Sequence, residues 1–120
     1  MIEGIHAIVY SRQADETRAF FRDVLGLESV DAGGGWPIFA LPPAELAVHP
    51  ADEDGRHELY LMCRDLQRTI EALRERGVET TPPQEQPWGV LTRVLLPGGG
   101  ELPLYQPRHP SPVMPNTPNP

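Results

Sequence analysis

Four aromatic side chains are candidates for lining a binding pocket: Trp36, Tyr60, Trp88 and Tyr105. Trp88 lies in the segment QEQPWGV, where proline and glycine predict a loop, and loops carry binding residues disproportionately. Aromatic walls with few polar groups suit a planar organic ligand. Since each of these residues taken singly is more often packed in a core or a dimer interface, the prediction depends on whether the fold brings them together.

Residue types exclude several other chemistries. All ten positively charged side chains are arginine, so the chain has no lysine for a Schiff base or for a phosphate-binding P-loop. It also lacks the G-x-S-x-G and G-x-G-x-x-G patterns of nucleophile elbows and dinucleotide sites. The single cysteine, Cys63, lies in an apolar run and is interpreted as a buried structural thiol.

Charge and composition predict a cytoplasmic globular protein. The net charge of −7 argues against nucleic acid as a partner. No apolar run is long enough for a transmembrane helix, and the beginning of the sequence does not resemble a signal peptide, so we expect no membrane association. A lone cysteine fits a reducing compartment.

The chain contains an internal repeat. Residues 41–50 read LPPAELAVHP and residues 96–107 read LPGGGELPLYQP, and the alignment pairs Glu45 with Glu101 and His49 with Tyr105. Each copy follows a helical pattern that is closed by Gly26 or by Gly77. Paired modules often build one site between them, so the repeat predicts a single domain over residues 1–107, with module one at about 1–50 and module two at about 57–107.

Each module is expected to read β-α-β-β-β. Asp65 is the predicted N-cap of the second helix, and the glycine triplets at 33–35 and 98–100 are predicted hairpin turns. The proline-rich tail, residues 108–120, is interpreted as an extended arm or a disordered end. The expected strands lie at 4–10, 28–32, 36–41, 45–49, 58–63, 78–81, 90–96 and 101–106, and the expected helices at about 15–25 and 66–76.

This order of elements, together with the helix ending FFRDVLGL and the second helix ending LRERGVET, resembles the vicinal oxygen chelate superfamily. That superfamily includes glyoxalase I, extradiol dioxygenases, fosfomycin-resistance transferases and bleomycin-binding proteins. The resemblance covers residues 4–107 and implies an α+β fold, in which two modules form a curved mixed sheet, a cup, with the helices outside. It also implies a homodimer, whose cup can be built between chains. Function does not follow, because this fold hosts many activities.

The resemblance further implies four metal-ligand positions, on the first and last strand of each module. They fall on His6, Ala47, Glu58 and Pro103, and only the first and third are side chains that can bind a metal. His49 is the candidate third ligand, although its register differs by two residues from that of Ala47. With His49 the set is two histidines and a carboxylate, as in non-heme iron oxygenases. The expected cofactor is one divalent ion (iron, zinc, nickel or manganese) if His49 reaches the cup, and none if it does not.

The counting leaves one ambiguity open, between His57 and Glu58. Counting back from Asp65 selects Glu58, whereas counting back from Gly77 selects His57. Adjacent strand residues face opposite sides, so only one of them enters the cup. Glu58 shares a face with Tyr60, which favours Glu58.

Two functions are therefore expected. The first is a glyoxalase/bleomycin-resistance-type protein that binds a small organic ligand without a conventional four-ligand metal. The second is a metal-dependent lyase, isomerase or extradiol-type dioxygenase that uses His6, His49 and Glu58, with Glu58 or His49 as the catalytic base. The missing ligands at Ala47 and Pro103 favour the first.

Overall fold

The structure is a computed structural model that describes residues 6–55 and 57–113. Positions 4 and 5 of the first expected strand, Arg56 of the linker and residues 114–120 of the tail lie outside the described residues. In the described part of the chain, no helix has the length and apolar character needed to cross a membrane.

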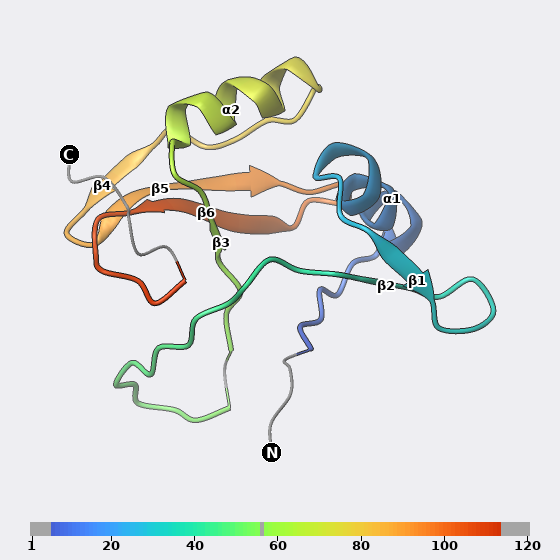
Figure 1. Ribbon diagram of the computed structural model, residues 1–120, viewed down its shortest axis with the longest axis horizontal. Coiled ribbons are helices and arrows are strands. Elements are labelled where there is room, and N and C mark those ends of the chain that lie inside the picture. Colours follow the sequence, from blue (N-terminus) through green and yellow to red (C-terminus); the bar gives the residue numbers. More distant parts are fainter. Residues whose placement is uncertain (1–5, 56, 114–120) are drawn as a thin grey trace.

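The second half of the chain contains a four-stranded mixed sheet (Figure 1). Its order is β3-β6-β5-β4; β3 pairs with β6 in parallel, and the other neighbours are antiparallel. The glycine triplet at 98–100 connects β5 to β6, as the sequence predicts. The strand bounds are Leu61–Met62 for β3, Gln84–Gln86 for β4, Gly89–Leu95 for β5 and Glu101–Pro107 for β6.

Helix α2, Leu66–Glu75, follows β3 and is confirmed in type, position and cap. The Asp65 carboxylate accepts a hydrogen bond from the backbone N–H of Arg68 at 3.1 Å, which satisfies one of the free donors of the first turn. Apolar residues at spacings of four and three lie on one face of the helix, and this face packs against the sheet. The buried residues of this face are Leu66, Ile70 and Leu73.

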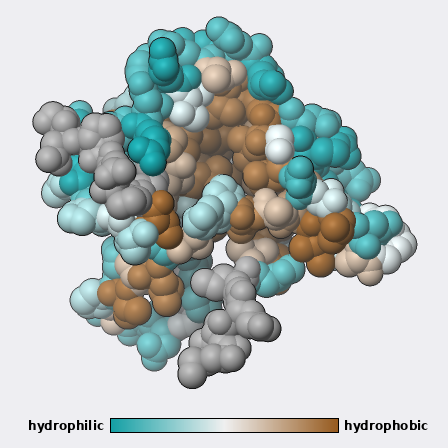
Figure 2. All heavy atoms as spheres, in the orientation of Figure 1, coloured by the Kyte–Doolittle hydropathy of each residue, from teal (hydrophilic) through white to brown (hydrophobic). Residues whose placement is uncertain are grey.

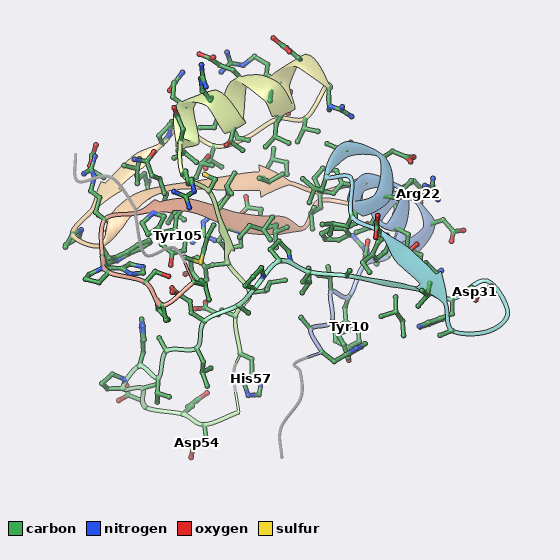
Figure 3. The ribbon with its side chains drawn as sticks, viewed as in Figure 1. Tyr10, Arg22, Asp31, Asp54, His57 and Tyr105 are labelled. Carbon is green, nitrogen blue, oxygen red and sulfur yellow. The ribbon has the colours of Figure 1, made fainter. Side chains whose placement is uncertain are left out.

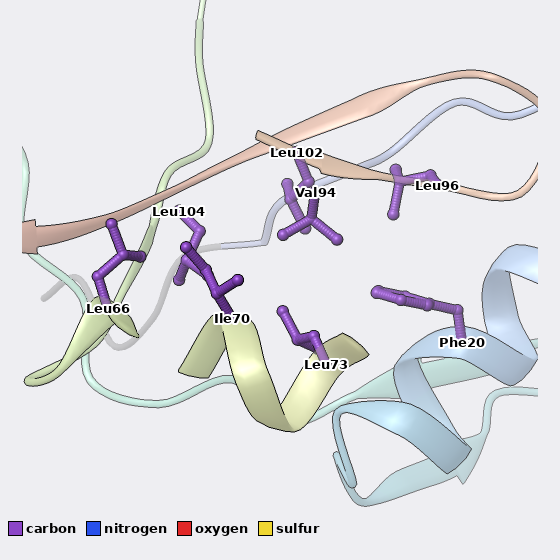
Figure 4. Close-up of a cluster of buried hydrophobic side chains, with 8 residues drawn as sticks. All are labelled: Phe20, Leu66, Ile70, Leu73, Val94, Leu96, Leu102 and Leu104. Carbon is purple, nitrogen blue, oxygen red and sulfur yellow. The ribbon is translucent and has the colours of Figure 1, made fainter. Parts of the chain in front are cut away.

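The first helical segment is less regular. It consists of α1, Ala14–Ala19, and a π-helical turn, η1, Phe20–Val24, and it ends at Gly26, whose φ is +70°. Phe20 is 5% exposed and packs with the apolar face of α2 against the sheet (Figure 4). Both helical segments therefore cover the same face of the sheet, as expected for a cup with external helices. The core cluster comprises Phe20, Leu66, Ile70, Leu73, Val94, Leu96, Leu102 and Leu104.

The first half forms a smaller, two-stranded sheet from β1, Ser29–Asp31, and β2, Pro37–Phe39. The glycine triplet at 33–35 makes the predicted turn between them. Asp31 holds this turn, because its carboxylate accepts backbone hydrogen bonds from Gly33 at 2.8 Å and from Trp36 at 3.1 Å. These bonds stabilise the charged form, so the pKa of Asp31 lies below its usual value, with the Gly33 bond as the main cause.

Some expected strands are absent or shorter in the described structure. Residues 6–10 and 45–49 are extended but belong to no strand, and 78–81 contributes a single bridge, between Thr80 and Val94. Conversely, β4 forms where a loop was expected, because it can pair with β5 through the turn at Pro87 and Trp88. Alternation of apolar residues identifies a segment suited to a sheet, but a strand also needs a partner edge, and that partner is set by long-range contacts.

A candidate ligand site on the cup face

The face of the four-stranded sheet that points away from the helices is the cup face, which carries Tyr60, Pro103 and Tyr105. Side chains alternate along a strand. Leu102 and Leu104 belong to the core under the helices, so Pro103 and Tyr105 of β6 point to the opposite side. Leu59 and Leu61 likewise pack against the core, which directs Tyr60 to the cup face. Figure 3 shows Tyr105 on this side of the sheet.

Three of the four predicted pocket residues meet in an aromatic cluster, defined as Tyr60, Trp88 and Tyr105. The ring centroids of Trp88 and Tyr105 are 5.2 Å apart, those of Tyr60 and Tyr105 are 5.9 Å apart, and those of Tyr60 and Trp88 are 6.4 Å apart. All three contacts are edge-to-face, the arrangement that the ring quadrupoles favour. The hairpin turn between β4 and β5 positions Trp88, which is 36% exposed, at the rim of the cluster.

The fourth predicted residue, Trp36, lies elsewhere. It sits at the end of the β1–β2 turn, is 62% exposed and stacks beneath Arg18, whose guanidinium carbon is 4.6 Å from the ring centroid. This cation–π contact accounts for the position of its ring.

A polar network surrounds the hydroxyl of Tyr105. That hydroxyl donates to Oε1 of Glu45 at 3.2 Å and lies 3.0 Å from Nε2 of His109. Ser111 donates its hydroxyl to Oε2 of Glu45 at 2.6 Å. The network joins three distant parts of the chain: the segment after β2, strand β6 and the beginning of the tail.

Tyr105 is buried, and its hydroxyl lies beside the carboxylate of Glu45. The residue is only 7% exposed, and burial raises the pKa of its hydroxyl to about 12, with further contributions from the charge of Glu45 and the hydrogen bond to it. A phenolate beside a carboxylate in a low-dielectric site is unfavourable, so the hydroxyl keeps its proton and acts as a hydrogen-bond donor.

The described part of the tail, residues 108–113, is named the C-terminal strap. Its first residue is fixed to the β4–β5 hairpin, because the backbone N–H of Arg108 donates to the carbonyl of Trp88 at 2.9 Å and its guanidinium pairs with Glu85. Its middle residues, His109 and Ser111, turn back over Tyr105. Ser111 is 8% exposed, and the His109 ring lies beside the Tyr105 ring.

The predicted metal ligands are not gathered. His6, His49 and Glu58 are all exposed, as is His57. Among the described residues, no three His, Cys, Asp or Glu side chains lie close enough together to hold a metal ion. Together with Ala47 and Pro103, which have no donor atom at the positions that the resemblance assigns to ligands, this donor set does not fit a conventional metal centre within one chain.

Glu58 lines a separate hollow of about 300 Å³ at the edge of the sheet. Ile8, Val9, Arg93 and Pro103 also line this hollow. Glu58 precedes β3, Leu59 lines the same hollow, and the choice of Glu58 over His57 stays a prediction. Among the described residues, Glu58 does not form a group of three potential metal ligands with His6 and His49.

The sequence prediction did not include Glu45, His109 or Ser111 among the site residues. One signal was present: Glu45 and Tyr105 both belong to the repeated segments, which predicted last strands at equivalent places of the two modules. Nothing in the sequence indicated that the tail would return to this site.

The sequence matches no protein-family model, and no curated protein is significantly similar to it. Solved structures do match. TnmS3, an antibiotic binding protein from Streptomyces sp. CB03234, superposes with a TM-score of 0.65 at 23% identity, covering 88% of this chain and 97% of TnmS3. A member of the glyoxalase/bleomycin resistance protein/dioxygenase superfamily from Sphaerobacter thermophilus DSM 20745 gives 0.60 at 26% identity, with 88% and 98% covered.

Lactoylglutathione lyase from Agrobacterium tumefaciens also matches, with a TM-score of 0.60 at 14% identity, over 87% of this chain and 92% of that protein. A binding protein and an enzyme thus share the fold of this chain. At these sequence identities the fold does not determine the activity. The module order, the mixed sheet, the external helices and these matches lead to one conclusion: the chain has the glyoxalase-like fold of the vicinal oxygen chelate superfamily.

Proposed function

We propose that this protein binds a small aromatic compound in its cup and needs no metal ion to do so. The observation that carries the proposal is the aromatic cluster on the cup face. Tyr60, Trp88 and Tyr105 offer ring faces and edges, and the buried hydroxyl of Tyr105 supplies the oriented polar group that a specific pocket requires.

Two further observations support metal-free binding. The positions that the resemblance assigns to metal ligands include Ala47 and Pro103, which cannot coordinate an ion. The fold is also shared with TnmS3, which is an antibiotic binding protein, so a structure of this kind can serve to hold an organic compound. The proposed ligand is correspondingly planar and largely apolar.

We also propose that the working form is a homodimer. The extended segment 45–49 carries Leu46 and Val48, which are 83% and 90% exposed, and apolar side chains show on this part of the surface in Figure 2. Exposed apolar side chains on an unpaired extended segment favour association with another chain. The segment begins with Glu45, so association would also cover one side of the candidate site.

Fluorescence titration with 1-naphthol tests the ligand proposal. In a Trp36→Phe background, Trp88 is the remaining tryptophan, and we expect its emission to change saturably as the compound binds. Tyr60→Ala in the same background should weaken binding about tenfold, because an edge-to-face ring contact is lost. Tyr10→Ala removes a ring that is 89% exposed and is the matched control. Equal affinities for the Tyr60 and Tyr10 variants would contradict the proposal.

Metal analysis of the purified protein tests the proposal that binding needs no metal ion. We expect protein purified without chelators to bind 1-naphthol without stoichiometric iron, zinc, nickel or manganese. A stoichiometric ion that is lost in His6→Ala would instead support the metal-dependent function, with ligands contributed by two chains.

A further inference from the structure

The C-terminal strap offers the aromatic cluster the same groups that an aromatic ligand would offer. The His109 ring lies beside the Tyr105 ring, with centroids 5.8 Å apart and planes inclined by 36°. Its Nε2 is within hydrogen-bond distance of the Tyr105 hydroxyl, at 3.0 Å. A planar ring with a polar atom thus already lies against Tyr105, the one side chain of the cluster that is buried.

Glu45 makes the second contact between the site and the strap. This carboxylate accepts from two hydroxyl groups, those of Tyr105 and Ser111, and its side chain is 21% exposed. An ionised carboxylate can only accept hydrogen bonds, so a half-buried one must be supplied with donors. The strap provides one of them through Ser111 and places the ring of His109 with its Nε2 3.8 Å from Oε1 of Glu45.

We infer that residues 109–111 occupy the ligand site of the free protein, and that the ligand is a planar aromatic compound with an O–H or N–H donor that replaces the Ser111 hydroxyl on Glu45. This inference rests on the proposed function and specifies its ligand class. The ring of the ligand takes the place of His109 on Tyr105. Compounds whose only polar group is a carboxylate are disfavoured, because Glu45 would repel them.

The anchoring of the strap is consistent with a local exchange. Arg108 is held to the β4–β5 hairpin by its ion pair with Glu85 and by its backbone bond to Trp88, and neither contact involves Glu45. The contacts at Arg108 therefore need not break when residues 109–111 leave Tyr105. The strap then acts as an intramolecular competitor that lowers the apparent affinity for ligand.

The first experiment uses the full-length chain and removes the two side chains that hold the strap to Tyr105 and Glu45. In His109→Ala/Ser111→Ala we expect 1-naphthol to bind about tenfold more tightly than in the wild type, because hydrogen bonds that hold the competitor are lost. Naphthalene, which lacks the hydroxyl, should bind more weakly than 1-naphthol to both proteins. Unchanged affinity for 1-naphthol in the double variant would overturn the inference.

The second experiment replaces the carboxylate of Glu45 by a weaker, neutral acceptor. Glu45→Gln should reduce the preference for 1-naphthol over naphthalene, since a neutral amide oxygen is a weaker acceptor than a carboxylate. The matched control is Glu101→Gln, which changes the exposed glutamate at the equivalent place of the repeat and should leave the preference unchanged. An equal loss in both variants would show that the general negative charge, and not the site, sets the preference.

A ligand-free measurement separates failure of this inference from failure of the proposed function. Ultraviolet titration of the tyrosines should show a group that ionises near pH 12 in the wild type and at lower pH in His109→Ala/Ser111→Ala, because Tyr105 becomes exposed. If this shift occurs but no aromatic compound binds either protein, the strap covers Tyr105 and the proposed function is wrong. If ligand binds and the titrations coincide, the strap inference is wrong.

Discussion

At the scale of single residues, the buried Tyr105 hydroxyl makes the free energy of unfolding depend on pH in the alkaline range. Its pKa in the folded protein is about 12, above the ordinary value of about 10 for tyrosine. The folded state therefore holds this proton more tightly than the unfolded state does. The resulting contribution to stability is fully present below about pH 10 and is lost as the pH rises through about 12.

Tyr105→Phe should remove this dependence. Between about pH 10 and pH 12 we expect the free energy of unfolding of the wild type to fall by about 2 kcal/mol more than that of Tyr105→Phe. Urea unfolding at a series of pH values measures the difference, and the other titrating groups are common to both proteins. Parallel curves for the two proteins would show that Tyr105 ionises alike in the folded and unfolded states.

The residues of the site illustrate what the sequence can predict at this scale. Tyr60, Trp88 and Tyr105 were predicted as pocket residues from their types and their positions in strands and a loop, and the fold brings them together. Glu45 and Glu101 hold equivalent places in the repeat, yet only Glu45 is drawn into a network. The difference arises from contacts with the tail that are far away in sequence, and no local pattern encodes them.

At the scale of secondary-structure elements, the β5–β6 hairpin depends on the absence of a side chain at Gly89. This glycine begins β5 opposite Pro107, and a Cβ atom built there would collide with the backbone carbonyl oxygen of Gln106 and approach the Cα of Pro107 to 3.2 Å. A glycine inside a strand often marks such a close approach of another backbone.

Gly89→Ala should consequently lower the free energy of unfolding by about 2–3 kcal/mol, because the backbone of β6 cannot move aside without disturbing its neighbours. Gly100→Ala is the control: its added Cβ meets only the Leu96 side chain, at 3.8 Å, an ordinary contact distance. Chemical denaturation of both variants measures the difference. Similar midpoints for the two would show that the hairpin can shift to accommodate the methyl group.

Elements were predictable to the extent that their signals are local. Helix α2 was correctly predicted because its cap, at Asp65, and its apolar face lie within one segment. The segments 6–10 and 45–49 show the alternation of strands but are unpaired in the described chain. Their equivalents in module two, β3 and the last strand β6, do pair with each other. Pairing depends on two segments meeting, which alternation within one of them cannot predict.

At the scale of the whole molecule, that unpaired segment argues for association. Leu46 and Val48 are more exposed than apolar side chains of a strand that faces a core, and no partner strand within the described chain covers them. Burying both in a second chain would remove apolar area from water and provide backbone partners for the extended segment. We therefore predict that the protein sediments at twice its monomer mass of 13.3 kDa.

Leu46→Asp/Val48→Asp should shift this equilibrium to the monomer, since two charges would have to be buried in the interface. Ala51→Asp/Ala72→Asp adds the same two charges at exposed positions outside the segment and should remain dimeric. Sedimentation equilibrium over a range of protein concentrations distinguishes the species. A monomeric wild type at every concentration would refute the dimer. Dimers in both variants would move the interface away from residues 45–49, and the candidate site would then be complete within one chain.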